Sequence, residues 1–125
     1  MSGAERPPQR PSGGWEIPPA EVKRLLDDRA AGRGAPFTLV DCRREEEVLL
    51  ARIEGSVHIP LEDLDRRHQE LDDRGEGPIV VYCHHGVRSL KAAALLRARG
   101  IPGVMSMAGG LERWSREIDP TVPRY

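Results

Sequence analysis

The sequence predicts an α/β domain built on a mainly parallel five-stranded sheet with helices on both faces. Short apolar segments of strand type alternate along the chain with segments whose apolar residues recur at helical spacing. This alternation is typical of a sheet whose successive strands run parallel. The 125 residues are enough for one domain with a modest core, and they leave no room for a second.

The strand segments are short and bounded by turn residues. Residues 79–83 are the most apolar of them, and residues 37–42 are β-branched and end in a charge. Gly75, Gly77 and Pro78 predict a turn just before residues 79–83. The predicted strands are residues 15–17, 37–42, 55–60, 79–83 and 104–107. Because open parallel sheets bind ligands at the carboxyl ends of their strands, the chemistry is expected just after Cys42 and just after Cys83.

Helical segments separate the strands. Val22, Leu25 and Leu26 form one apolar stripe after Pro19, which suits a first helical turn. The acidic run at residues 45–47 is interpreted as a solvated helix start. Ser89 is interpreted as an N-cap, with a glycine stop at residue 100. The predicted helices are residues 19–29, 43–52, 61–71, 90–99 and 111–118.

Proline and glycine dominate residues 1–14, which are too poor in apolar side chains to offset their ordering entropy. We therefore expect a disordered N-terminal tail over residues 1–14, a domain over residues 15–118 and a C-terminal tail over residues 119–125. Residues 1–14 contain no apolar segment typical of a secretion signal. No apolar run approaches the length of a membrane span.

Charge and cysteine content narrow the function. The formal net charge of −1 gives no broad basic field, so nucleic acid is not an expected partner. No membrane partner is expected either, because the apolar runs are too short to span one. Cys42 and Cys83 are too few for a disulfide framework and match no Cys-x-x-Cys pattern. Free thiols of this kind predict a reducing compartment, and we expect a cytoplasmic protein.

Cys83 opens the segment that carries the predicted chemistry. It ends a buried strand and is followed by His84, His85, Gly86, Val87, Arg88 and Ser89. A turn of this type points successive backbone N–H groups inward as an anion-binding nest, and the following helix adds its positive end. Arg88 adds a full charge and a forked donor set. These features favour a thiolate, the nucleophilic form of cysteine, over the alternative of an inert core thiol.

At this point the chain resembles the single-domain rhodanese family. Residues 82–89, Tyr-Cys-His-His-Gly-Val-Arg-Ser, are similar to the family's active-site loop, and Cys83 matches its persulfide-bearing cysteine. Residues 39–43 resemble the family's Asp-Val-Arg strand end, residues 53–60 its Ile-Pro-Gly-Ala-x-Asn-Ile-Pro segment, and residues 107–114 its late Gly-Gly…Trp segment. The four motifs occur in the family's order and span most of residues 15–118.

The resemblance implies a sulfurtransferase, here a transferase with a cysteine nucleophile. Cys83 would take sulfane sulfur from a small donor such as thiosulfate, hold it as a persulfide, and pass it to cyanide, a thiol or a protein acceptor. No cofactor is implied. Residues 117–125 also resemble the end of rhodanese domains fused to adenylyltransferases that activate sulfur carriers, which indicates a relay role. A non-catalytic, rhodanese-like binding module is the alternative, and such modules commonly lack the cysteine.

Other readings of the loop are weaker. Cys-x4-Arg, from Cys83 to Arg88, is one residue shorter than the Cys-x5-Arg phosphate loop of tyrosine phosphatases. His84 and His85 invite a zinc site, but no second ligand pair has metal-site spacing, so no metal is expected. Asp41 and Arg43 are interpreted first as an ion pair that supports the loops. Cys42 is interpreted as core packing, with a resolving thiol as the alternative.

Overall fold

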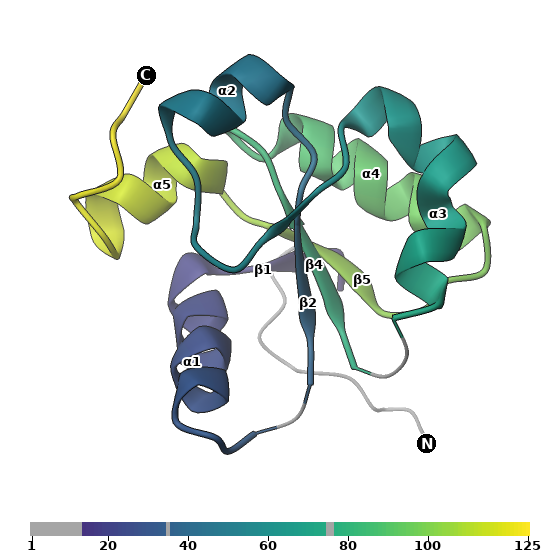
Figure 1. Ribbon diagram of the computed structural model, residues 1–125, viewed down its shortest axis with the longest axis horizontal. Helices are drawn as coiled ribbons and strands as arrows, with labels where there is room; N and C mark the ends of the chain where they lie inside the picture. The colour runs from purple at the N-terminus through teal and green to yellow at the C-terminus, as the bar shows by residue number, and fades with distance from the viewer. Residues whose placement is uncertain (1–13, 35, 75–76) are drawn as a thin grey trace.

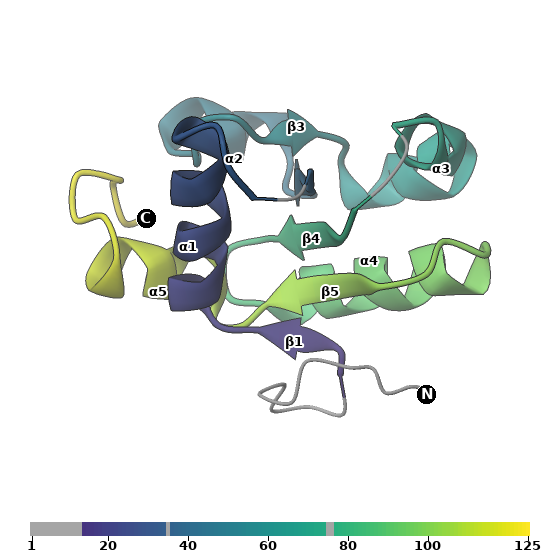
Figure 2. The ribbon, with the colours of Figure 1, turned by 90° about the horizontal axis from the view of Figure 1, so that it is seen from below.

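A single parallel sheet organises the chain. The structure is a computed structural model that describes residues 14–34, 36–74 and 77–125. Five strands lie in the order β1-β5-β4-β2-β3, and every neighbouring pair is parallel. Figures 1 and 2 show the twisted sheet with helices on either side. The predicted fold class is confirmed.

The strands fall where the sequence predicts them. Four of them are shorter than their predicted segments, because only the residues that share ladder hydrogen bonds with a neighbour belong to the strand, and β5 has the predicted bounds. The bounds are β1 Glu16–Ile17, β2 Thr38–Asp41, β3 Val57–His58, β4 Ile79–Tyr82 and β5 Val104–Met107. Most of the predicted tail at residues 1–14, and Gly75 of the predicted turn, lie outside the described residues.

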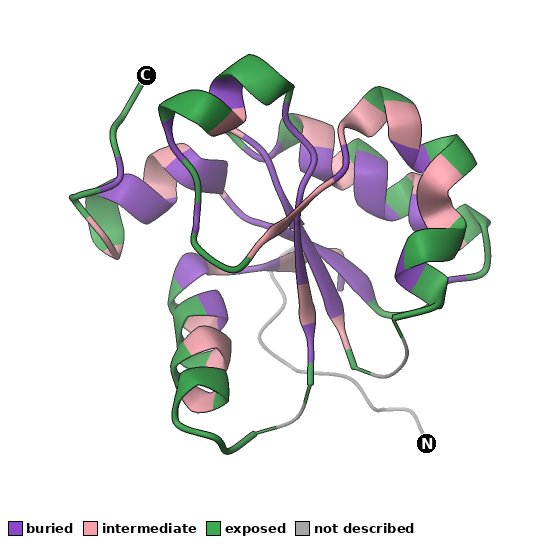
Figure 3. Ribbon diagram, in the orientation of Figure 1, coloured by how far each residue is buried: buried purple, intermediate pink, exposed green. Residues whose placement is uncertain are grey.

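The helices cover the two faces of the sheet in pairs. Alternation along β4 sends Val80 and Tyr82 to a core shared with α1 and α5, and Ile79 and Val81 to a core shared with α3 and α4. The helices are α1 Pro19–Ala30, α2 Glu45–Leu50, α3 Leu64–Asp72, α4 Val87–Ala98 and α5 Gly110–Glu117, with a 3₁₀ turn at Leu61–Asp63. Figure 3 shows the buried strands between helices that are exposed on their outer sides.

One helix begins earlier than predicted. Helix α4 starts at Val87, its N-cap is Gly86, and Ser89 lies buried inside its first turn. Gly86 has φ 100°, a left-handed conformation that favours glycine. The prediction that Ser89 caps the helix is therefore wrong, because its hydroxyl is directed to the interior of the site rather than to the helix end.

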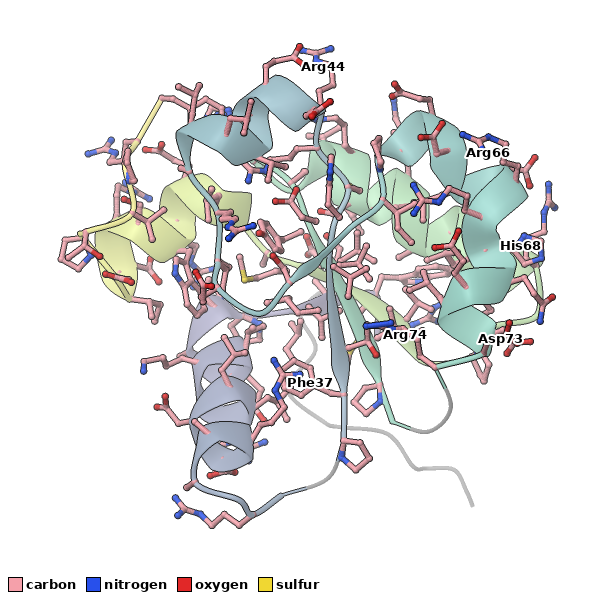
Figure 4. All side chains as sticks on the ribbon, in the orientation of Figure 1. Phe37, Arg44, Arg66, His68, Asp73 and Arg74 are labelled. Atoms are coloured by element: carbon pink, nitrogen blue, oxygen red, sulfur yellow. The ribbon has the colours of Figure 1, made fainter. Side chains whose placement is uncertain are left out.

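Helix α2 lies over the carboxyl edge of the sheet (Figure 1). The solvated start predicted for residues 45–47 is wrong for Glu47, which is 8% exposed, whereas the side chain of Glu46 is 74% exposed. Figure 4 shows the neighbouring Arg44 pointing away from the domain, and Arg66 and His68 pointing outward from α3. Among the described residues, no helix has the length and apolar character that crossing a membrane requires.

Candidate active site at Cys83

The carboxyl ends of β2 and β4 bring the two cysteines together. Asp41 pairs with Tyr82 in the parallel ladder, so Cys42 and Cys83 leave neighbouring strands at the same level. Both thiols are free, both are 1% exposed, and both belong to the core that α3 and α4 cover. This is the edge where the sequence analysis expects the chemistry.

Three donors surround the Cys83 sulfur. The backbone N–H groups of Gly86 and Ser89 donate to Sγ at 3.1 and 3.3 Å. The Ser89 hydroxyl lies 3.4 Å from Sγ, and it donates to the sulfur when Cys83 is a thiolate. The two N–H groups belong to the N-cap and the first turn of α4, so the turn and the observed helix start both face this sulfur.

The start of α5 fixes the direction of the loop. Backbone N–H groups of Leu111 and Glu112 donate to the carbonyls of Cys83 and His84, at 2.8 and 3.0 Å. These bonds turn the carbonyls away from the sulfur and leave the N–H side of the loop facing it. Gly110 makes the close approach possible, since an added Cβ there would lie 2.4 Å from the His84 carbonyl oxygen.

A buried serine that the sequence analysis did not identify completes the donor chain. Ser106 on β5 is fully buried, and its hydroxyl lies 2.6 Å from the hydroxyl of Ser89. When Ser106 donates to Ser89, the Ser89 hydrogen is free to point at Cys83. A polar residue inside the otherwise apolar strand at residues 104–107 was the available signal.

The two thiols have opposite acidities. Interaction with the Cys42 thiol is the largest influence that lowers the pKa of Cys83 below its ordinary value. Burial opposes it, and the Ser89 hydroxyl and the Ser89 and Gly86 N–H groups add to it. The same interaction, together with burial, raises the pKa of Cys42. Of the pair, Cys83 alone receives the two backbone N–H bonds, which favours the anion on Cys83 and the neutral thiol on Cys42.

The Arg88 side chain lies differently from the expectation that its fork serves the sulfur. Its Nη1 and Nη2 donate to the two carboxylate oxygens of Glu47, at 2.6 and 2.8 Å. The bond to Glu47 is the largest influence that raises the pKa of Arg88, and the charge of Cys83 contributes less. Arg88 therefore attracts the thiolate through space while its end nitrogens are occupied by a carboxylate.

Asp41 and Arg43 form the ion pair that the sequence analysis favours. Nε and Nη2 of Arg43 donate to the two oxygens of Asp41, at 2.9 and 2.6 Å, and the Arg43 side chain is fully buried. Nη2 also donates to the Ala51 carbonyl at 2.5 Å, and Nη1 donates to the Tyr125 hydroxyl at 2.6 Å. The pair thus fixes the loops that follow β2 and α2 beside the site.

Tyr125 reaches the Cys83 loop and the buried Glu47 beside it. The Tyr125 hydroxyl donates to Glu47 Oε2 at 2.9 Å, and its ring stacks on His84 with centroids 4.0 Å apart. His84 also lies against His85, with ring centroids 3.9 Å apart. The contacts from residue 125 and the buried Glu47 were not found from the sequence. Tyr125 ends a proline-containing segment and Glu47 lies in an acidic run, and neither local pattern indicates a buried contact.

The two loop histidines lie at the rim. Burial, followed by the charge of His85, lowers the pKa of His84, so that its ring is neutral near pH 7. His84 Nε2 is buried and has no hydrogen-bond partner, and it lies 4.0 Å from a Glu112 oxygen. His85 is exposed. Within residues 14–34, 36–74 and 77–125, no group of three or more side chains of metal-ligand type is assembled.

A separate cleft of about 820 Å³ lies on the side of the domain that α1 and α5 cover. Its walls come from α1, residues 52–54, α5 and residues 118–123, and no residue of the Cys83 loop lines it. Its charged side chains include the Lys23–Asp27 ion pair at 2.6 Å and the exposed Arg52 and Glu54, whose nearest charged atoms lie 3.9 Å apart. The perturbed acidities and inward donors are at Cys83, so the candidate active site is placed there.

Comparison with known proteins agrees with this geometry. A family model described as "Rhodanese-like domain" matches residues 18–117. A maize protein named "Adenylyltransferase and sulfurtransferase MOCS3-1" is 36% identical over 110 residues, covering 84% of this chain and 22% of that protein. The mouse "Adenylyltransferase and sulfurtransferase MOCS3" is 34% identical over 126 residues, covering 84% of this chain and 26% of its own length. The chain thus spans about a quarter of these relatives.

Solved structures show the same fold. The human single-domain sulfurtransferase TSTD1 has a TM-score of 0.66 and 28% identity, covering 82% of this chain and 96% of that chain. A rhodanese-related protein from Thermoplasma volcanium has a TM-score of 0.69 and 25% identity, covering 89% and 99%. The family match extends over most of the chain and includes the whole Cys83 loop. The chain belongs to the rhodanese-like domain family, whose members include these sulfurtransferases.

Proposed function

We propose that this chain is a sulfurtransferase that carries sulfane sulfur as a persulfide on Cys83. The observation that carries the proposal is the sulfur itself, held by two backbone N–H groups and the Ser89 hydroxyl. These donors stabilise an anion without adding a competing base, and they are already in place before any substrate arrives. A binding module that had lost its chemistry would have no need of a thiolate cradle.

The reaction has two half-reactions with balanced charges. The Cys83 thiolate attacks the outer sulfur of a donor such as thiosulfate, an S–S bond forms, and the bond to the sulfonate sulfur breaks with release of sulfite. Cyanide, a thiolate or another acceptor then attacks the terminal sulfur of the persulfide and restores the Cys83 thiolate. Both forms of Cys83 are anions that the same donors stabilise.

A protein acceptor is the second part of the proposal. The named relatives join an adenylyltransferase to a sulfurtransferase, which favours a relay of sulfur to a protein partner. Leu49, Leu50 and Val87 are 80%, 60% and 62% exposed, on α2 and at the start of α4. Exposed apolar side chains around a reactive cysteine favour contact with another protein. We infer a cytoplasmic site of action from the two free thiols.

The test is the intact mass of the protein after treatment with thiosulfate. We expect a gain of one sulfur atom, located on the Cys83 peptide, and its loss as thiocyanate when cyanide is added. Cys83→Ser is expected to show neither, because a hydroxyl has no comparably accessible anion. Cys42→Ser, which keeps a small donor beside the sulfur, is expected to retain most of the turnover. Turnover by Cys83→Ser would refute the proposal.

A further inference from the structure

Glu47 binds the guanidinium of Arg88, the charged side chain of the Cys83 loop. Both end nitrogens of Arg88 are held by its carboxylate, and the side chains are 29% and 11% exposed. Glu47 is held in turn by the Arg44 backbone N–H at 3.1 Å and by the Tyr125 hydroxyl at 2.9 Å. The carboxylate is therefore fixed from three directions rather than resting on the surface.

The charges around Cys83 cancel in pairs. Glu47 balances Arg88, and Asp41 balances the buried Arg43. His84 is neutral, and Glu112 at the far side of His84 is paired with Arg124. The charge left over at the sulfur is that of the Cys83 thiolate. A donor that arrives with two negative charges thus meets an anion and no free cation among these groups.

We propose that Glu47 is a specificity-determining residue, because by occupying Arg88 it disfavours doubly charged donors such as thiosulfate relative to donors that carry sulfane sulfur with one charge. This inference rests on the proposed function and concerns the donor class of the same site. Arg88 remains attached to the loop, so removing the Glu47 charge frees a bidentate cation for a sulfonate group. Tyr125 is a positioning residue in this arrangement, since its hydroxyl holds the Glu47 carboxylate toward Arg88.

Two donors that differ by one charge isolate the effect. Thiosulfate carries two charges, and methanethiosulfonate replaces one of its oxygens by a methyl group and carries one. With either donor, Cys83 forms an S–S bond to the outer sulfur and the leaving group departs with the electron pair, as sulfite or as methanesulfinate. The persulfide product is the same, so the ratio of the two rate constants reports donor charge and not the later steps.

The experiment measures persulfide formation by intact mass under single-turnover conditions with each donor. Glu47→Gln keeps the shape of the side chain and removes its charge. We expect the ratio of thiosulfate to thiosulfonate rate constants to rise about tenfold, equivalent to about 1.4 kcal/mol. The matched control is Glu46→Gln on the same helix, whose side chain is 74% exposed and contacts Arg44 at 3.5 Å. We expect less than about a twofold change there, because an exposed pair is screened.

Two further variants keep the test decisive. Adding Arg88→Gln to Glu47→Gln is expected to remove the gain, which assigns it to the freed guanidinium. Tyr125→Phe removes only the hydroxyl that holds Glu47, and it is expected to shift the ratio in the same direction by a smaller factor. If Glu47→Gln does not fold, the Tyr125→Phe ratio decides. An unchanged ratio in folded protein overturns the inference, and failure of the wild type to form a persulfide with either donor overturns the proposed function instead.

Discussion

The Ser89 hydroxyl offers a direct measure of how the site stabilises an anion. Its oxygen lies 3.4 Å from the Cys83 sulfur and 2.6 Å from Ser106. A hydrogen bond to a charged group contributes about 1.5–3 kcal/mol. At 1.36 kcal/mol per pKa unit, Ser89→Ala should raise the pKa of Cys83 by about 1–2 units. The two backbone N–H donors remain, so the pKa should stay below the ordinary value of a free thiol.

The assay follows iodoacetamide alkylation of the Cys83 peptide against pH by mass spectrometry. This readout separates Cys83 from Cys42 without changing Cys42, whose thiol is the largest influence on the Cys83 pKa. Ser106→Ala removes a donor to Ser89 but no donor to the sulfur, so it should raise the midpoint by less than Ser89→Ala does. Ser56→Ala is the control, because its hydroxyl bonds the Ile53 carbonyl and the Tyr82 hydroxyl instead.

The result that refutes this reasoning is a Ser89→Ala midpoint within about half a unit of wild type. The hydroxyl would then be a neutral neighbour of the sulfur, and the backbone donors with Cys42 would carry the whole effect. A wild-type midpoint at or above about 8.5 would be a larger failure. It would show that burial, which raises the pKa of Cys83, outweighs every donor in the loop.

The remaining predictions concern the turn, the buried carboxylate and the loop length. Gly86→Ala should cost about 1–2 kcal/mol of stability and raise the Cys83 pKa, because φ is 100° and the new Cβ would lie 3.2 Å from the Gly109 nitrogen. Gly100→Ala, with φ 89° in open space, should cost stability and leave the pKa unchanged. The bond to Arg88 lowers the pKa of Glu47 to about 2 from 4.5, so its stabilisation, about 3 kcal/mol, is present above pH 4.5 and lost as the pH falls toward 2. In urea unfolding, the free energy by which wild type exceeds Glu47→Gln should therefore shrink as the pH falls through that interval. Aryl phosphates should not turn over at about 1 per second or faster, because the six-residue loop offers too few inward donors for a phosphate.

The sequence predicts the sheet and the position of Cys83 for local reasons. Alternating strands and helices force parallel strands, and parallel strands bring residues 42 and 83 to one edge of the sheet. The resemblance then adds the reaction class. Both steps use information carried within a few residues of each strand end, and the structure confirms the edge and the neighbouring strands.

The contacts missed by sequence reasoning are those between distant segments. Glu47 and Arg88 are 41 positions apart, and Glu47 and Tyr125 are 78 positions apart. A charged run at a helix start has the same local pattern whether one member is buried or none is. Ser89 was misread for a related reason, because an N-cap and a buried donor are both serines at a helix start and only the position of β5 separates them.

The arrangement of charges explains why fixed dipoles suit this site. In the proposed first half-reaction the protein carries one negative charge before the transfer, on the thiolate, and one after it, on the persulfide. Donors that are neutral and rigid, such as N–H groups of a helix start, stabilise both forms without rearrangement. An unpaired arginine at the sulfur would bind the leaving sulfite as readily as the donor and hold it at the site. Because Glu47 occupies Arg88, the guanidinium is not available to retain sulfite. Glu47, which is proposed to disfavour thiosulfate as a donor, is therefore also expected to speed the release of sulfite.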